Sequence, residues 1–437
     1  MLSACLGLIS TWNETNAQKP YDFICTGLYC PVIEPGSPGS WDELWIFTPH
    51  AIINDGTFYL FYTGFNASGI PSIGMATSPD GFTFTKNAGN PLLEHSASGF
   101  DSYSVSQGIV IEDPSGGWIM FYNGREIPDF APGPFIGRAT ATNLTGPWIR
   151  SASPVLSTGS QGEWDEVVVT PNSLIPLDTG GFIMFYTGVN DITGYVQIGM
   201  ATSPDGITWT KYNDPSTTEH PYMESDPVLK AGDSLVWDDW SAWECSVLKN
   251  SGYYEMYYSG SDHSANTESI GYAWSLDGIS WTKDSSNPVY TYTEDPYAVL
   301  MGYTALTKPS VVPVVEDSIA FMYYYYNTFG AGLGMATADI DVGTNDKRFT
   351  KDDLRVTIYP NPVYQSAMFS YTLEESVQVK LEIFNSIGQS VVELLNCSQK
   401  KGEHHVSWNA ETFPAGIYYV RLQVGEMVGS VKVVKVR

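Results

Sequence analysis

Apolar and polar residues alternate along most of the chain, and aromatic side chains fill many of the apolar positions. The runs TFYLFYTG (57–64), GWIMFYNG (117–124), GFIMFYTG (181–188), YYEMYYSG (253–260) and IAFMYYYYN (319–327) are typical. Each run is short, rich in residues that favour strands, and flanked by Gly, Asp, Asn or Ser. This pattern predicts an all-β protein with many short strands.

The predicted strands recur as a repeat. SIGMATSPDGFTFTK (72–86) returns as QIGMATSPDGITWTK (197–211) and SIGYAWSLDGISWTK (269–283), with a degenerate copy at 135–150 and a truncated copy at 332–340. Four units start with an aromatic–Asp pair, at Trp41, Phe100, Trp164 and Trp237, which are 59, 64 and 73 residues apart. Such spacing suits four-stranded blades, so residues 19–341 are predicted to form a five-bladed β-propeller.

The fifth unit (302–341) ends after its third strand, and YCPVIEPG (29–36) matches the missing fourth strand. This N-terminal segment is therefore predicted to complete the last blade and close the ring, which leaves no free sheet edge. The SPDG turns resemble the Asp boxes of sialidase-type propellers. Their repetition predicts a structural role, with the aromatic residue after each turn packed between blades.

A different domain follows a polar linker (342–353). Residues 354–437 alternate apolar and polar positions and predict a small immunoglobulin-like β-sandwich. The motifs YPNP (359–362), FNSIGQ (384–389) and AGIYYV (415–420), followed by a basic last strand, resemble the type IX secretion C-terminal sorting domain of Bacteroidetes. The resemblance implies contact with the type IX secretion machinery and a secreted or cell-surface location. An ordinary carbohydrate-binding sandwich is the alternative.

Residues 1–18 resemble a truncated signal peptide, and the chain has no apolar run long enough for a transmembrane segment. The formal charge of −27 is uneven, since residues 354–437 contribute 8 − 7 = +1 and the remainder 13 − 41 = −28. A domain this acidic argues against a nucleic-acid partner. No Cys/His pattern predicts a zinc site, no cofactor is expected, and a structural calcium ion is left open. An exported location would permit a disulfide between Cys25 and Cys30.

The propeller resembles the five-bladed glycoside hydrolases of families 43 and 32. The resemblance implies an active site in a funnel at one end of the central axis and a carbohydrate substrate. Aligning the starts of the inner strands puts Pro49, Gln107, Pro171, Glu244 and Pro309 in one column. Glu244 alone breaks this column with a carboxylate. Its WEC motif (243–245) also matches the motif that carries the acid/base Glu of invertase-like enzymes, although here it falls in the fourth blade rather than the third.

Glycoside hydrolysis needs one protonated carboxyl group and one ionised carboxylate. Glu244 is the predicted acid, because burial near Trp240 and Trp243 would raise its pKa. Asp42 is the predicted partner, with Asp165 or Asp101 as a third carboxylate. These aspartates belong to the repeated aromatic–Asp pairs, so a structural role, capping inner strands through backbone N–H groups, is the alternative. The family's Asp-Pro and Arg-Asp-Pro signatures are absent from blades one and two.

Further residues interrupt the repeat on the funnel face and are candidate substrate contacts. They are His50, Gln107, Arg125, Asn172, His263 and Lys308, together with the aromatic residues Trp45, Tyr103, Trp240 and Trp243. The sequence therefore supports two hypotheses. The first is a secreted glycoside hydrolase-like protein that cleaves a neutral poly- or oligosaccharide, with Glu244 as proton donor. The second is a non-catalytic carbohydrate-binding or adhesive surface propeller.

Overall fold

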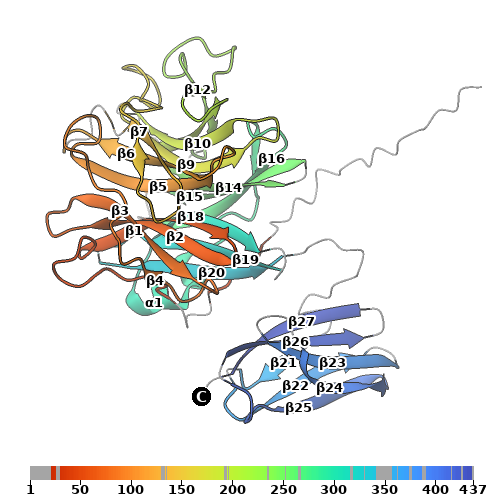
Figure 1. The fold of residues 1–437 in the computed structure, drawn as a ribbon. Helices are drawn as coiled ribbons and strands as arrows, with labels where there is room; N and C mark the ends of the chain where they lie inside the picture. Colours follow the sequence, from red (N-terminus) through yellow and green to blue (C-terminus); the bar gives the residue numbers. More distant parts are fainter. Residues whose placement is uncertain are drawn as a thin grey trace, which may run out of the picture. The chain divides into compact units, whose positions relative to one another are not determined.

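The computed structural model describes residues 21–25, 30–128, 133, 135–190, 194, 196–233, 236–250, 252–263, 267–314, 318–328, 330–340, 357–361, 363–373, 376–385, 390–414, 416–424 and 427–435. The chain forms two compact units, Met1–Ile340 and Asp341–Arg437 (Figure 1). The predicted signal peptide (1–18) and linker (342–353) lie outside the described residues.

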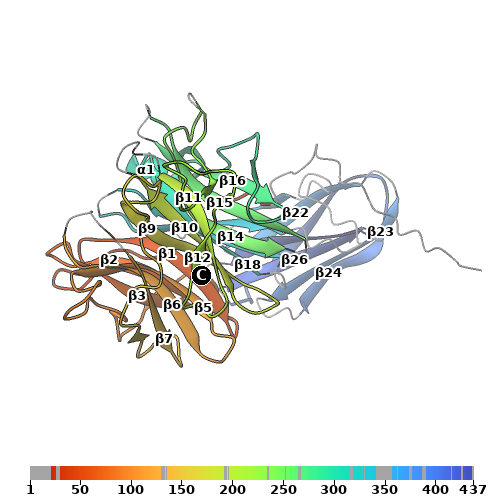
Figure 2. The ribbon, with the colours of Figure 1, turned by 90° about the horizontal axis from the view of Figure 1, so that it is seen from above.

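The first unit consists of five antiparallel β-meanders, each with the first strand innermost (Figure 1 and Figure 2). Blade 1 contains β1 (Trp45–Asn54), β2 (Thr57–Phe65), β3 (Pro71–Ser78) and β4 (Thr85–Lys86). Blade 2 contains β5 (Ser104–Glu112), β6 (Trp118–Arg125), β7 (Phe135–Ala141) and β8 (Ile149–Arg150). Blade 3 contains β9 (Val168–Pro176), β10 (Phe182–Val189), β11 (Val196–Ser203), β12 (Thr210–Lys211) and β13 (Pro227–Leu229).

Blade 4 contains β14 (Ser241–Asn250), β15 (Tyr253–Ser261), β16 (Glu268–Ser275) and β17 (Trp281–Lys283). A 3-10 helix, η1 (Tyr292–Glu294), and a short helix, α1 (Pro296–Met301), connect it to blade 5. Blade 5 contains β18 (Leu306–Val314), β19 (Ile319–Tyr326) and β20 (Leu333–Asp339). Five meanders therefore stand where the repeat predicted five blades, and one parallel pair, Val196 with Ser241, joins blades 3 and 4 into a single sheet.

The N-terminal segment completes blade 5. Ile33 bridges Leu333 on β20, and the backbone N–H of Val32 donates to the carbonyl of Leu333 at 2.8 Å. Ile24, which precedes the sequence motif, also bridges β20, at Thr337. The prediction that the N-terminus supplies the last fourth strand is confirmed.

The Asp-box turns are structural, as their repetition predicted. Asp80 Oδ1 accepts from the backbone N–H of Phe82 at 2.9 Å, and the equivalent Asp205 and Asp277 do the same for Ile207 and Ile279. The aromatic residue that follows packs on the preceding blade. Ring centroids are 5.4 Å apart for Trp209 and Phe121, and 5.8 Å apart for Trp281 and Phe185.

The second unit contains two antiparallel sheets. One holds β21 (Thr357–Tyr359), β22 (Ser366–Leu373) and β25 (Gly402–Asn409). The other holds β23 (Val377–Asn385), β24 (Ser390–Gln399), β26 (Gly416–Val424) and β27 (Met427–Lys435). Alternate residues of both sheets, such as Phe369, Leu381, Trp408 and Val420, meet in one buried cluster. No helix among the described residues is long and apolar enough to cross a membrane.

Candidate functional site

Each inner strand of the propeller carries a β-bulge at the same height. In blade 4, Trp243 pairs with Ser259 and Cys245 with Tyr258, which leaves Glu244 unpaired in the ladder. The pairing shifts at the same place in blades 1, 2 and 5, and one residue later in blade 3, where Asn172 is the unpaired residue. Counted from the flanking pairs, the column that contains Glu244 consists of Thr48, Gln107, Pro171, Glu244 and Lys308.

This column corrects the sequence alignment in blades 1 and 5. Pro49 and Pro309 lie one residue beyond the column, and Thr48 and Lys308 occupy it. The alignment matched these prolines to Pro171, but strand pairing, rather than residue type, sets the position. Glu244 remains the column's only carboxylate, and the structure adds Lys308 as its only ammonium.

The bulge gives the column its backbone conformation. The φ angles of Thr48, Gln107, Glu244 and Lys308 are 54°, 54°, 37° and 58°, in the left-handed region that side chains with a Cβ rarely adopt. Such residues cost about 1–3 kcal/mol each and persist only where surrounding contacts hold them. Bulges of this kind re-aim side chains next to active sites, and here they bring four side chains to one pocket.

Contacts between neighbouring blades hold the bulges in place. The backbone N–H of Glu244 donates to the Thr187 hydroxyl at 2.9 Å, and that of Lys308 donates to the Ser259 hydroxyl at 2.8 Å. Pro171 has no N–H to give. Accordingly, Oδ1 of Asn123, the residue of blade 2 equivalent to Thr187, has no hydrogen-bond partner in the described part of the chain.

Four predicted site residues meet in a pocket at this level of the central axis. Gln107, Asn172, Glu244 and Lys308 line it together with Thr48, Pro49, Ile109, Cys245 and Pro309. The cavity measures about 20 Å³, which is room for a single water molecule. The Gln107 amide nitrogen donates to the Pro171 carbonyl at 3.2 Å and so spans two blades.

Glu244 and Lys308 form an ion pair, and the two side chains are 7% and 11% exposed. The Lys308 ammonium also lies 4.8 Å from the ring centroid of Phe47 and 5.0 Å from that of Trp243. The second carboxyl oxygen of Glu244, Oε2, is buried and has no hydrogen-bond partner among the described residues. Burial raises the pKa of Glu244 above its ordinary value, although Lys308 and Gln107 act to lower it.

Sequence reasoning missed a second carboxyl group, Glu268. It begins β16, and its Oε2 accepts a hydrogen bond from the Asn327 amide. Burial raises the pKa of Glu268, Lys308 acts to lower it, and the charge of Glu268 in turn raises the pKa of Glu244. The signal was present in the repeat, because the position three residues before the repeated glycine of the third strand is Pro71, Val196 and Ala331 in blades 1, 3 and 5. Glu268 breaks that column with a carboxylate, as Glu244 breaks its own.

The structure places the three predicted catalytic aspartates away from this cluster, in the outer parts of their blades. Asp42 accepts from the Tyr62 hydroxyl at 3.2 Å and pairs with the Lys86 ammonium at 2.5 Å. The same pattern joins Asp101 to Tyr122 and Arg150, Asp165 to Tyr186 and Lys211, and Asp238 to Tyr258 and Lys283. These contacts favour the structural alternative, through Tyr hydroxyls and cations rather than the backbone N–H groups expected from the sequence.

The remaining candidates are spread over other parts of the propeller. Trp240 meets the ring of His263 at a centroid distance of 4.5 Å, and Trp45 meets Phe65 at 4.5 Å. The backbone N–H of Tyr103 donates to the carbonyl of Arg125 at 2.8 Å, and burial lowers the pKa of Arg125.

His50 lies deeper in the channel, in a cavity of about 110 Å³ that Ser173, Ser246 and Ser310 also line. Its Nε2 is 2.9 Å from the carbonyl oxygen of Val110, and burial lowers its pKa to about 4. Folding therefore keeps His50 neutral, whereas the unfolded chain protonates it below its ordinary pKa of about 6.5. The free energy of unfolding is therefore unaffected by His50 above pH 6.5. It decreases as the pH falls from 6.5 toward 4, because only the unfolded chain takes up the proton in this range.

We therefore expect the free energy of unfolding to depend less on pH in His50→Gln than in the wild type. Glutamine keeps a donor for the Val110 carbonyl but does not titrate. Between pH 7 and pH 4.5 the wild type should lose about 2 kcal/mol more than the variant. Urea unfolding at both pH values measures this difference, and equal losses would show that His50 is protonated in the folded protein.

The fold and the second unit together define a class: a secreted or cell-surface five-bladed β-propeller with a C-terminal sorting domain. Residues 357–436 match the family model of the secretion system C-terminal sorting domain. This confirms the resemblance to type IX sorting domains and the predicted location. No curated protein matches the sequence significantly.

Solved structures resemble the propeller in fold. A candidate glycoside hydrolase from Parabacteroides distasonis is 17% identical, with a TM-score of 0.59 over 74% of this chain and 98% of its own. A structure described for the GH130 family of mannoside phosphorylases, a family with hydrolases that target β-1,2-mannosidic linkages in Candida mannan, is 18% identical, with a TM-score of 0.60 over 75% and 98%. A glycosyl hydrolase from Bacteroides ovatus is 18% identical, with a TM-score of 0.57 over 72% and 93%. The expected likeness to glycoside hydrolase propellers is confirmed at the level of the fold.

Proposed function

We propose that this propeller cleaves glycosidic bonds of a neutral poly- or oligosaccharide, with Glu244 as the proton donor. The observation that carries the proposal is the buried ion pair of Glu244 with Lys308, together with the half-buried carboxyl group of Glu268, whose pKa the charge of Lys308 lowers. With both carboxyls ionised the three groups carry −2 + 1 = −1, and one added proton brings them to zero. A site that holds one proton between two carboxyls has the acid and the carboxylate that glycoside hydrolysis needs.

We assign the acid to Glu244, whose pKa burial raises, and the carboxylate to Glu268. Protonated Glu244 gives its proton to the leaving oxygen as the bond to the anomeric carbon breaks. Ionised Glu268 attacks that carbon or takes a proton from the attacking water. Lys308 then stabilises the new Glu244 carboxylate through the existing ion pair. Glu268 takes the part that the sequence assigned to Asp42, because Asp42 is already neutralised by Lys86.

A panel of plant, algal and bacterial glycans tests the proposal. The purified wild-type chain should generate new reducing ends on at least one neutral glycan, detected by chromatography and mass spectrometry. Parallel reactions with inorganic phosphate separate hydrolysis from phosphorolysis, since a phosphorylase would release a sugar phosphate only when phosphate is present. Products that require phosphate would contradict the hydrolytic course.

Non-catalytic carbohydrate binding is the second candidate function, and one observation favours it. The ion pair with Lys308 stabilises Glu244 as a carboxylate, which has no proton to donate. Retention of a glycan on immobilised protein without any new reducing end would support this alternative.

The two sheets of the second unit are proposed to form an immunoglobulin-like sandwich that the type IX secretion machinery recognises. Deletion of residues 357–436 is expected to abolish delivery to the cell surface or medium and to leave the propeller in the periplasm. Immunoblots of cell fractions measure the distribution. Undiminished delivery of the truncated chain would contradict the role of this unit, and intact folding of the retained propeller is checked by its thermal unfolding.

A further inference from the structure

The outer edge of blade 5 differs in chemistry from the other four blades. Blades 1–4 each pair a buried aspartate with a Lys or Arg of the fourth strand. In blade 5 the aspartate is Asp295, which is fully buried and accepts from the Tyr324 hydroxyl as Asp42 accepts from Tyr62. The sequence repeat did not reveal Asp295, because a glutamate rather than an aromatic residue precedes it.

A cysteine occupies the place of the lysine. Ile24 bridges Thr337 in the register that the Thr-Lys segment adopts in blade 1. Cys25 therefore stands where Lys86 stands. In the described part of the chain no ammonium or guanidinium pairs with Asp295. Its carboxylate instead accepts from two tyrosine hydroxyls and from two backbone N–H groups at the start of α1.

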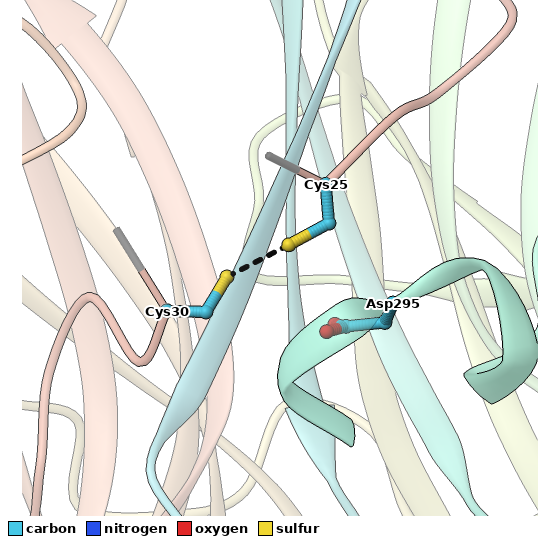
Figure 3. A group of neighbouring side chains, drawn as sticks. All are labelled: Cys25, Cys30 and Asp295. Atoms are coloured by element: carbon cyan, nitrogen blue, oxygen red, sulfur yellow. Dashed lines mark hydrogen bonds between the residues drawn. The ribbon is translucent and has the colours of Figure 1, made fainter. Parts of the chain in front are cut away.

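A second cysteine occupies the place of an asparagine. In blade 1 the Asn90 amide donates to the Met75 carbonyl at 2.8 Å, and in blade 5 the Cys30 thiol donates to the Met335 carbonyl at 3.3 Å. The sulfur atoms of Cys25 and Cys30 are 3.2 Å apart and point toward each other beside Asp295 (Figure 3). In blade 5, two cysteines in contact thus replace the lysine and the asparagine that blade 1 has at these positions.

We propose that Cys25 and Cys30 form a disulfide once the protein is exported, and that this bond holds the strand that closes the propeller ring. The two thiols lose two protons and two electrons as the S–S bond forms. The electrons reduce the disulfide of a cell-envelope thiol oxidant to a dithiol, which takes up the protons.

The surroundings favour this reaction. Cys30 is the more exposed of the two, and its hydrogen bond with Cys25 lowers its pKa, so we assign Cys30 as the thiol that attacks the oxidant. Cys25 then displaces the oxidant from the mixed disulfide. Forming the bond requires the sulfur atoms to approach by about 1 Å. An uncharged disulfide also suits a position next to a buried carboxylate, where a thiolate is repelled.

A metal ion is the competing occupant. One sulfur or oxygen atom from each of Cys25, Cys30 and Asp295 lies within 4.8 Å of the others, an arrangement that a thiolate-binding cation such as zinc can use. The Asp295 carboxylate already accepts four hydrogen bonds, and a metal would have to displace at least one of them. The contacts therefore favour the disulfide.

Mass spectrometry of the full chain, secreted and purified without reductant, tests the bond. The peptide that contains both cysteines should be lighter by two hydrogen atoms before reduction than after it. Cys397→Ser, at an exposed cysteine of the second unit, is the control and should leave this difference unchanged. Two reduced thiols with stoichiometric zinc in elemental analysis would replace the proposal by a metal site. Two reduced thiols without metal would also overturn it.

Amide hydrogen exchange tests the consequence for ring closure. Reduction should speed exchange of the Val32 N–H, which pairs with Leu333, by about tenfold, the order that loss of a short cross-link gives. The equivalent Leu92 N–H of blade 1, which pairs with Ile73, should not change. The variant with both cysteines changed to serine should exchange at the reduced rate with or without reductant. Equal exchange of Val32 in oxidised and reduced protein would refute the structural role of the bond.

Discussion

Replacing Glu244 by glutamine is expected to lower kcat/KM on a cleaved glycan about 10³-fold, because glutamine has no proton to give to the leaving oxygen. The side chain keeps its size, and the backbone N–H contact of residue 244 with Thr187 does not depend on the carboxyl group. Because the variant leaves the buried Lys308 ammonium without its ion-pair partner, the thermal midpoint should fall below that of the wild type, so rates are compared per folded molecule. Initial rates from reducing-end release, measured on glycans that the wild type cleaves, give the comparison.

Glu255→Gln is the matched control for this variant. Glu255 lies on β15 of the same blade, is 1% exposed, and has its pKa raised by burial, as Glu244 does. It lies outside the pocket, so its variant should retain wild-type activity. Equal rates for wild type and Glu244→Gln on every cleaved glycan would remove Glu244 from the role of acid.

Replacing Lys211 by methionine is expected to lower the free energy of unfolding by about 3 kcal/mol, because it leaves a buried carboxylate without its cation. Asp165 is fully buried, and its pair with Lys211 spans 2.6 Å. Activity per folded molecule should not change, since this ion pair lies in the outer part of blade 3. Denaturant unfolding and assays on the folded fraction measure the two effects.

Lys249→Met provides the control for an exposed ion pair. Lys249 and Asp178 are 2.8 Å apart, but the Asp178 side chain is 92% exposed. Water solvates these charges with or without the partner, so the unfolding midpoint should stay within experimental error of the wild type. A similar loss in both variants would contradict the structural role assigned to Asp165. A lower kcat in Lys211→Met at full folding would return Asp165 to the catalytic candidates.

The propeller fold could be predicted from the sequence because each repeat contains the residues that pack it against the preceding blade. Trp209 and Trp281 follow their Asp-box turns and pack on the preceding blade. The closing strand could be recognised because its Pro-Val-Ile segment copies the end of the other units. Asp295 escaped recognition because a glutamate precedes it and because Cys25, which takes the place of the lysine, comes from the N-terminal segment and reaches it only through ring closure.

The site was harder to predict, for a physical reason that particular residues illustrate. The sequence revealed Glu244 because Glu244 interrupts an inner-strand column. It placed Lys308 one residue out of register, because the sequence does not show where a β-bulge inserts an extra residue into a strand. Glu268 interrupts a different column and was overlooked. Asp42 and Asp165 attracted attention through their aromatic neighbours, but the lysines that neutralise them come from the fourth strand, more than 40 residues later.

The dependence of the Glu244→Gln defect on the leaving group tests the central claim most directly. A natural glycoside needs a proton on the leaving oxygen, whereas an aryl glycoside with a good leaving group does not. The ratio of wild-type to variant kcat/KM should therefore be about 10³ on the natural glycoside and close to one on the aryl glycoside. Equal ratios on both substrates would contradict the assignment of Glu244 as proton donor.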